Sequence, residues 1–238
     1  MSETSQFKLP LVAAAQAQKH VTVNEALARL DAVAQLQLVS VSATVPPLGA
    51  SDGTAYGVPA GAVNDWNGHA GEVAVLANGG WVFLTPLAGW RAFVIDDHKT
   101  AFHDGTAWRT DALVVSAGGA ATIHRITEID HVIGAGATST TANVIANGEQ
   151  VIGITGRVVV DLTGTGLTGW ELGVAGSSNR YGSGLGISKN SWVRGLSGAP
   201  VTYWADTPLV LTPTGGNFAT GTVRLAVHSV ALEVPASV

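Results

Sequence analysis

The chain of 238 residues contains no cysteine, which excludes disulfide bonds, thiolate nucleophiles and cysteine-ligated zinc. Charged residues are also scarce, since they make up 12% of the chain against roughly 25% in typical soluble domains. The 12 Lys and Arg residues are outnumbered by 17 Asp and Glu residues, so no basic stripe is available to displace counterions from a phosphate backbone. We therefore expect no nucleic acid partner.

Long apolar runs are missing as well. The N-terminus has neither the basic start nor the apolar stretch of a secretory signal, and no later segment approaches the roughly 18 apolar residues of a membrane span. We therefore expect assembly in the cytoplasm without a signal peptide, and no membrane insertion.

Glycine is abundant instead, with 30 residues in a chain that is 46% hydrophobic. Clusters of Gly, Ser and Thr separate short apolar segments, which is typical of strands and turns. The sequence predicts a mainly β fold with three parts: a short N-terminal helical segment (residues 1–45), a small Trp-rich β-hairpin module (46–115) and a C-terminal antiparallel β-sandwich, jelly-roll-like (116–238).

Helical character is confined to the first part. Thr22 followed by Glu25 matches a capping box, which predicts that the helix begins at Thr22. Apolar residues then recur at three- and four-residue steps and form one stripe, which must dock on its own chain, on copies of itself or on a larger body. We assign oligomerisation or anchoring to this stripe, which consists of Val23, Leu27, Leu30 and Ala34.

Strand patterns fill the rest of the chain. Asn78-Gly79-Gly80 separates two apolar segments and predicts a tight hairpin, and a second hairpin is expected around Asp96–Lys99. Four of the seven Trp residues belong to this module: Trp66, Trp81, Trp90 and Trp108. In the last part, Val223, Leu225 and Val227 alternate with more polar residues, as in a strand with one buried face.

Several apparent catalytic motifs lack their structural context. Gly164–Gly169 fits the dinucleotide-binding spacing, but a strand rather than a helix is expected to follow it. The seven His residues show no metal-binding spacing, and Asp97-His98 and His103-Asp104 are interpreted as solvated hairpin tips. We predict no catalytic residue, metal site or cofactor. A glycoside hydrolase stays open as an alternative, because the last part offers acidic residues that would have to converge on one cleft.

The aromatic residues of the last part indicate a sugar-binding site. Flat apolar rings suit the faces of a pyranose, and amide or guanidinium groups suit the hydroxyls on its rim. Trp170 is expected in the core and Tyr181, within a Ser/Gly-rich segment, is expected to face solvent. The predicted glycan-binding residues are Asn179, Arg180, Tyr181, Trp192, Arg194, Tyr203 and Trp204.

Three segments carry a resemblance to a known family. Leu9–Ala32 resembles the opening signature of an uncharacterised family from alphaproteobacterial prophages and gene transfer agents, and Gly71–Pro86 looks similar too. Ala142–Glu149, Asn179–Gly184 and Val223–His228 resemble the C-terminal part of longer members. The resemblance implies a head spike or fibre on the surface of a phage-like particle, or virion, that helps it adhere to capsular polysaccharide.

We therefore predict a structural adhesion protein whose partners are a host capsular or surface polysaccharide, a capsid or spike-base protein, and copies of itself. By analogy with other fibres, a homotrimer is expected, in which repeated weak sites act together. Besides the hydrolase, a structural adaptor without ligand stays open as an alternative; it predicts that all aromatic residues are buried or lie at subunit contacts.

Overall fold

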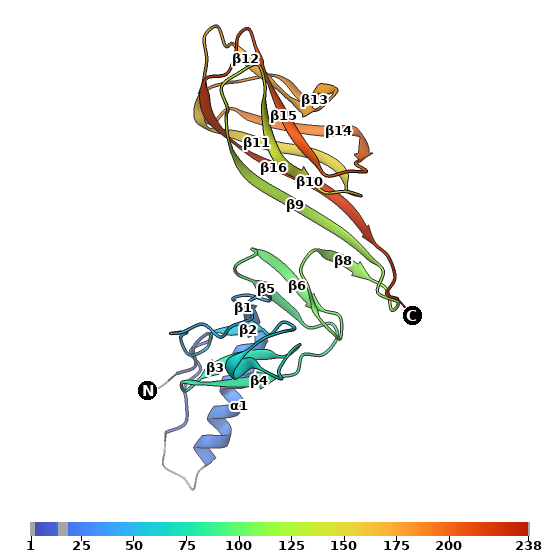
Figure 1. The fold of residues 1–238 in the computed structure, drawn as a ribbon. Helices are drawn as coiled ribbons and strands as arrows, with labels where there is room; N and C mark the ends of the chain where they lie inside the picture. The colour runs from blue at the N-terminus through green and yellow to red at the C-terminus, as the bar shows by residue number, and fades with distance from the viewer. Residues whose placement is uncertain (1–2, 14–18, 238) are drawn as a thin grey trace. The chain divides into compact units, whose positions relative to one another are not determined.

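The computed structural model describes residues 3–13 and 19–237 and divides the chain into two compact units, residues 1–111 and 112–238 (Figure 1). The first unit therefore combines the predicted helical segment with the Trp-rich module. As predicted, the fold is mainly β with a short N-terminal helix. Residues 14–18, part of the N-terminal motif that carries the resemblance, lie outside the described residues.

Helix α1 spans Lys19–Ala34. The predicted start at Thr22 is wrong, because Thr22 already lies inside the helix. Glu25 pairs instead with Arg29, one turn along, at 2.7 Å. A side chain at the other end of the helix holds the N-terminal segment: the Asp31 carboxylate accepts hydrogen bonds from the Thr4 hydroxyl and from the backbone N–H groups of Gln6 and Phe7.

Two small sheets complete the first unit. One is antiparallel with the strand order β2-β3-β4, and the other has the order β1-β5-β6-β7 with a parallel β1–β5 pair. The Asn78-Gly79 hairpin between β3 and β4 is confirmed, with φ of 52° and 75° at its two central residues. A single 3₁₀ turn, Asn64–Trp66, follows β2. The strands are β1 (Gln37–Leu38), β2 (Ala55–Gly57), β3 (Val73–Ala77), β4 (Gly80–Leu84), β5 (Arg91–Val94), β6 (Lys99–His103) and β7 (Trp108–Arg109).

The helix and the Trp-rich module share a hydrophobic core. Ala32 and Leu36 pack with Val73, Val75 and Ala92. A neighbouring aromatic cluster joins Tyr56, Trp66 and Trp81, with ring centroids 5.2–5.9 Å apart. The Trp residues of this unit therefore contribute to packing rather than to an exposed surface.

The second unit is a sandwich of two antiparallel sheets, as predicted. A five-stranded sheet with the order β14-β11-β16-β9-β8 packs over a four-stranded sheet with the order β10-β15-β12-β13. Figure 1 shows β9, β11 and β16 as long strands side by side. The strands are β8 (Ala112–Val115), β9 (Ala121–Val132), β10 (Ser139–Ile145), β11 (Gln150–Thr163), β12 (Gly169–Val174), β13 (Ser177–Leu185), β14 (Trp192–Thr202), β15 (Thr207–Thr214) and β16 (Thr220–Glu233).

One core fills the space between the two sheets. Val223, Leu225 and Val227 of β16 point into it with at most 1% exposure, which confirms the predicted alternation. Trp170, 2% exposed, is a core residue as expected, and its indole N–H donates to the carbonyl of Gly186. The segment around Tyr181 is strand β13 rather than a loop.

Candidate functional site

The seven predicted glycan-binding residues are divided between strand β13, which carries Asn179, Arg180 and Tyr181, and the two ends of strand β14. Trp192 and Arg194 are at the start of β14, whereas Tyr203 and Trp204 follow its end. On β11, the partners of Trp192 and Thr202 are Arg157 and Gln150, seven residues apart, which corresponds to roughly 23 Å along a strand. The seven residues therefore do not form one site.

Tyr181 is a correction. It is 2% exposed and packs in the core of the second unit, so the expectation that it faces solvent is wrong. Its hydroxyl lies 2.7 Å from the Tyr203 hydroxyl, and burial together with this hydrogen bond raises the pKa of Tyr181 far above its ordinary value. Both phenols act as structural groups that join β13 to the loop after β14.

Trp192 is the exposed aromatic residue at the start of β14. Its side chain is 62% exposed, and the Arg194 guanidinium carbon lies 5.8 Å from the centroid of its ring. The two residues are two positions apart on a strand, so their side chains lie on the same side of the sheet. An indole surface and a guanidinium are thus held together on regular, hydrogen-bonded backbone.

The solvent-facing side of the five-stranded sheet, here called the outer face, extends from this pair. Arg157 pairs with both Trp192 and Arg224, and Thr155 pairs with Arg194. The Thr155 hydroxyl lies 2.9 Å from His228 Nε2. Residues paired across an antiparallel ladder share a face, so Trp192, Arg194, Thr155 and Arg157 belong to one patch, which we call the Trp192 patch.

The charges on the outer face are unevenly paired. Arg224 donates to both oxygens of Asp130 at 2.7 Å and lies 3.8 Å from Glu128. In the described part of the chain, no carboxylate lies within ion-pair distance of Arg157 or Arg194. Among the residues that the structure describes, the acceptor for Arg157 is the backbone carbonyl of Asn190, at 3.1 Å.

Asn179 and Arg180 lie on the neighbouring strand β13 and are both exposed. This strand passes β14 so closely that a Cβ atom at Gly195 would overlap with the carbonyl oxygen of Tyr181. Arg180 and Arg194 each stand one position from this contact. The backbone therefore brings four predicted residues, Asn179, Arg180, Trp192 and Arg194, to one region of the second unit.

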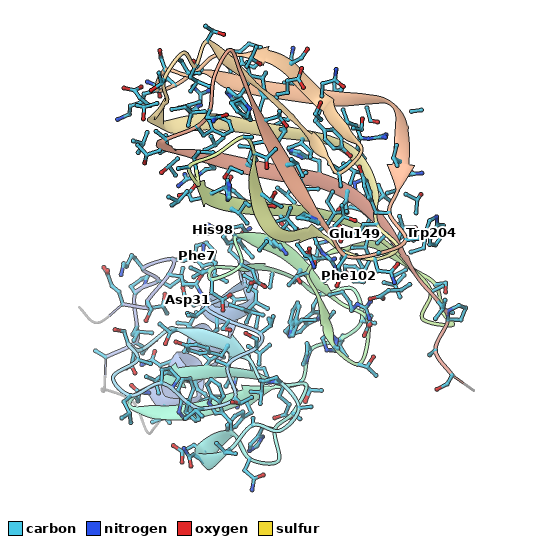
Figure 2. All side chains as sticks on the ribbon, turned by 45° about the horizontal axis from the view of Figure 1, so that its top comes forward. Phe7, Asp31, His98, Phe102, Glu149 and Trp204 are labelled. Carbon is cyan, nitrogen blue, oxygen red and sulfur yellow. The ribbon has the colours of Figure 1, made fainter. Side chains whose placement is uncertain are left out.

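Trp204 occupies the far end of β14 and is 81% exposed. Its loop is braced by two backbone hydrogen bonds, from Tyr203 N–H to the Glu149 carbonyl and from Gly148 N–H to the Tyr203 carbonyl. Figure 2 labels Trp204 and Glu149 in this region. No arginine–indole contact other than that of Trp192 occurs in the described residues, so Trp204 lacks the guanidinium neighbour that Trp192 has.

Three acidic residues of the second unit, Glu149, Asp161 and Asp206, serve structural contacts. Glu149 is 2% exposed and is held by Arg125 and the Ser229 hydroxyl. Asp161 accepts the backbone N–H of Lys189, and Asp206 accepts that of Asn147. Each of these carboxylates has a partner that accounts for its position, which gives the hydrolase alternative no specific support.

The predicted helix stripe is uncovered in the described chain. Val23 is 42% exposed and Leu30 is 55% exposed, and Ala34 is exposed while Leu27 is half-buried. The helix uses another side, with Ala32 at 3% exposure, to pack on its own unit. The four residues therefore present an apolar surface that does not contribute to the core of the first unit.

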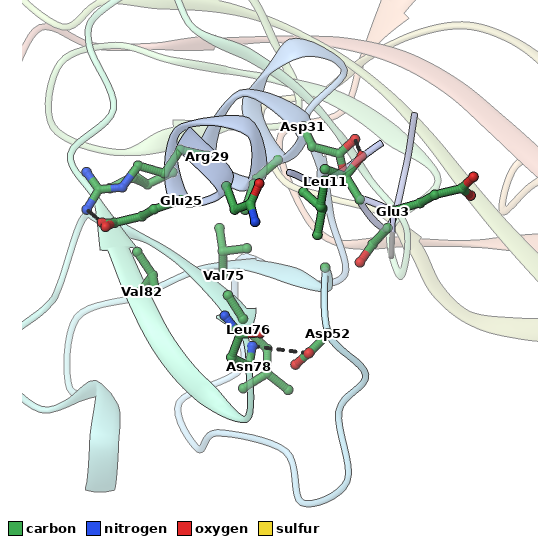
Figure 3. A pocket seen from close by; sticks show the side chains of 18 of the residues that line it. Glu3, Leu11, Glu25, Arg29, Asp31, Asp52, Val75, Leu76, Asn78 and Val82 are labelled. Atoms are coloured by element: carbon green, nitrogen blue, oxygen red, sulfur yellow. Dashed lines mark hydrogen bonds and ion pairs between the residues drawn. The ribbon is translucent and has the colours of Figure 1, made fainter. Parts of the chain in front are cut away.

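A cavity of about 530 Å³ lies between α1, the N-terminal segment and the β3–β4 hairpin (Figure 3). Val75, Val82 and Leu84 contribute apolar walls. Three of its four acidic side chains have partners: Asp52 accepts the backbone N–H groups of Asn78 and Gly79 at 3.1 Å, Asp31 holds the N-terminal segment, and Glu25 pairs with Arg29. The cavity offers space but no converging polar groups.

The two His–Asp pairs do not meet. Asp97-His98 occupies the exposed turn between β5 and β6, as predicted, whereas His103 ends β6 at its other end. His103 is 3% exposed and packs edge-on against Trp108 at 5.2 Å, so its interpretation as a solvated tip is wrong. Burial lowers the pKa of His103. Across residues 3–13 and 19–237, no group of three or more His, Asp or Glu side chains is arranged to hold a metal ion.

The sequence did not indicate that Arg157 and Thr155 lie beside Trp192. It also did not indicate that Arg224 is paired with Asp130 and Glu128. The segment around Arg157 was predicted as a strand, but its neighbours across the sheet depend on the register of β11 with β14 and β16. No local pattern encodes that register.

Comparisons with known proteins cover the two units differently. Residues 23–109, from α1 to β7, match a family described as a protein of unknown function (DUF2793). A comparison with curated proteins found no match. A chain in a structure titled "Cyanophage Pam1 capsid asymmetric unit" is similar at 21% identity and a TM-score of 0.36, over 52% of this chain and 93% of that chain. In the described part of the chain, no helix has the length and hydropathy of a membrane-spanning segment.

Proposed function

We propose that this chain is a structural adhesion protein of a phage-like particle, a head spike or fibre of the gene-transfer-agent type, that binds a host capsular or surface polysaccharide. It is assembled in the cytoplasm and acts on the surface of the released particle without catalysing a reaction. The motif resemblance of Leu9–Ala32 supports the particle assignment. One observation carries the binding half: an indole that is 62% exposed stands beside a guanidinium on a rigid sheet.

The physical reason is the cost of exposing Trp192. An indole left in water forgoes roughly 1.5–3 kcal/mol of burial free energy, and this one makes no contribution to the core. A pyranose face covers such a ring, and Arg194 at its edge donates several N–H groups to hydroxyl oxygens. The surrounding strand fixes both side chains before the ligand arrives, which limits the entropy lost on binding.

The helix stripe supplies the second half of the proposal. Val23, Leu27, Leu30 and Ala34 join copies of the chain into a homotrimer, or dock on a capsid or spike-base protein. With several Trp192 patches on one particle, weak single sites combine, and avidity rises by about 10²–10⁴ over a single site.

The test compares the two exposed Trp residues in the full-length protein. Binding to polysaccharide purified from the host surface is measured by biolayer interferometry for Trp192→Ala and for the control Trp204→Ala. Both side chains are exposed, so both variants keep the fold, which circular dichroism verifies. We expect Trp192→Ala to weaken binding at least tenfold and Trp204→Ala to leave it within twofold, since truncating a central aromatic contact residue typically costs about 2 kcal/mol or more.

Equal binding by wild type and Trp192→Ala would remove the Trp192 patch from the proposal. A loss confined to Trp204→Ala would move the site to the other end of β14. If no host polysaccharide is retained by the wild-type oligomer, the adhesion function is refuted and the adaptor alternative gains support.

A further inference from the structure

The Trp192 patch is more basic than the chain as a whole. The protein carries a formal net charge of −5, yet in the described residues no carboxylate lies within ion-pair distance of Arg157 and Arg194 of the patch, or of Arg180 on the nearby strand β13. Arg224, on the same outer face, is bound by Asp130 and flanked by Glu128. On the outer face, positive charge without a carboxylate partner therefore stands at Arg157 and Arg194, beside the exposed indole.

The positions of these arginines favour a ligand with its own negative charge. Arg194 lies at the ring of Trp192. Arg157 is the direct partner of Trp192 across the ladder, which places their Cα atoms about 4.5–5.5 Å apart. The hydrogen bond to Asn190 uses one N–H of Arg157, which leaves other donors of the planar guanidinium available. Asp161 is the next carboxylate along β11, and it accepts the backbone N–H of Lys189 rather than an arginine.

We propose that the Trp192 patch recognises an acidic saccharide, in which a carboxylate stands at the edge of a pyranose ring, as in a hexuronic acid. This inference rests on the proposed function and specifies its substrate class. The apolar face of the sugar covers the indole of Trp192, and the carboxylate accepts paired hydrogen bonds from Arg194 or Arg157. A lysine would supply only a point charge, whereas the planar guanidinium matches the two oxygens of a carboxylate.

Charge complementarity selects this ligand over a neutral one. A neutral hexose leaves the guanidinium groups with water as their partner, so it gains stacking alone. A carboxylated sugar gains stacking together with a charge-assisted hydrogen bond, and the positive patch on an acidic protein orients the polymer as it approaches.

The experiment uses the full-length protein with polymers of defined charge. Alginate, a polyuronate, is compared with carboxyl-reduced alginate, dextran and dextran sulfate, and with polysaccharide purified from the host surface, all at 150 mM salt. We expect alginate to bind at least tenfold more tightly than its carboxyl-reduced form and dextran. Arg194→Gln and Arg157→Gln each reduce alginate binding by roughly tenfold, the value of one charge-assisted hydrogen bond.

Arg91→Gln is the control for the change in net charge, because Arg91 is an exposed arginine of the first unit, outside the Trp192 patch. It changes alginate binding by less than threefold. Trp192→Ala separates sugar recognition from simple charge: it weakens binding of alginate while leaving the weak binding of dextran sulfate unchanged.

The outcomes distinguish this inference from the proposed function. If the host polysaccharide binds but carboxyl reduction of it and of alginate has no effect, the acidic preference is overturned and adhesion stands. If dextran sulfate binds as tightly as alginate and neither depends on Trp192, the patch is a general polyanion surface and the inference is overturned. If no polymer binds, the proposed function fails first.

Discussion

Replacing Gly195 with alanine tests how the Trp192 patch is built. Gly195 lies on β14 where this strand passes β13, and a Cβ atom there would overlap with the carbonyl oxygen of Tyr181. A backbone atom cannot rotate away as the end of a flexible side chain does, so β13 and β14 must separate. The change therefore acts on the strands that carry Arg180, Trp192 and Arg194.

The expected magnitude follows from the type of clash. Overpacking in a filled interior costs about 1–3 kcal/mol and sometimes more, and a rigid backbone obstacle places Gly195→Ala at the upper end, near 3 kcal/mol. Gly198, on the same strand, is the matched control because a Cβ atom there meets nothing within 4 Å. Gly198→Ala is expected to change stability by less than about 1 kcal/mol, since it mainly restricts the unfolded chain.

Differential scanning calorimetry of the full-length protein measures the difference. For a unit of residues 112–238, a loss of 3 kcal/mol corresponds to a decrease in Tm of roughly 10–15 °C. Gly195→Ala should show this decrease in one transition, and Gly198→Ala should not. Transition temperatures within 3 °C of each other for the two variants would refute the close approach of β13 and β14.

Three further predictions concern the first unit. Burial works to raise the pKa of Asp31, but the hydrogen bonds from Gln6, Phe7 and Thr4 outweigh it, so the pKa is lowered. The stabilisation by the Asp31 carboxylate is therefore present above the unfolded pKa of 3.8 and is lost as the pH falls through the folded pKa. In Asp31→Asn, hydrogen exchange of the Gln6 amide should accelerate at neutral pH. Burial lowers the pKa of His103, so the unfolded chain binds the proton more tightly, and the stability of the protein should fall as the pH decreases through 6.5. His103→Gln should reduce the decrease in Tm between pH 7.5 and pH 5.5 in thermal melts. The same decrease in Tm in wild type and variant would contradict this prediction. Leu30→Glu should dissociate the proposed homotrimer in sedimentation velocity, whereas Thr22→Glu, on the same helix, should not.

Local signals determined which elements the sequence predicted well. The β3–β4 hairpin follows from Asn78-Gly79, because few residues other than Asn and Gly adopt positive φ readily. The alternation in β16 follows from Val223, Leu225 and Val227, since one face of that strand is buried and the other is solvated. Both signals lie within a few residues of the structure that they specify.

Contacts between distant segments explain why the predictions for Tyr181 and for the grouping of the glycan-binding residues were wrong. Ser and Gly around Tyr181 suggest a loop, but Gly195 and Gly182 allow close strand packing there, and the hydroxyl partner Tyr203 lies 22 residues away. The Trp192 patch likewise depends on the β11–β14 register, which places Arg157 beside Trp192. Residue types indicated which side chains suit a sugar, whereas only the register shows which of them are neighbours.

The glycine-rich loop Gly164–Gly169 has a consequence for which substitutions this end of the sandwich accepts. It meets the loop before β16 through main chain on both sides: Cβ atoms at Gly164 and Gly216 would overlap with backbone oxygens of Asn217 and Thr165. Neither Gly164 nor Gly216 can be replaced by a larger residue unless the facing loop withdraws. Under the proposed function, a change of ligand specificity therefore falls to the outer face of the five-stranded sheet, where the exposed Trp192 and Arg194 can be exchanged without disturbing the closure of the sandwich.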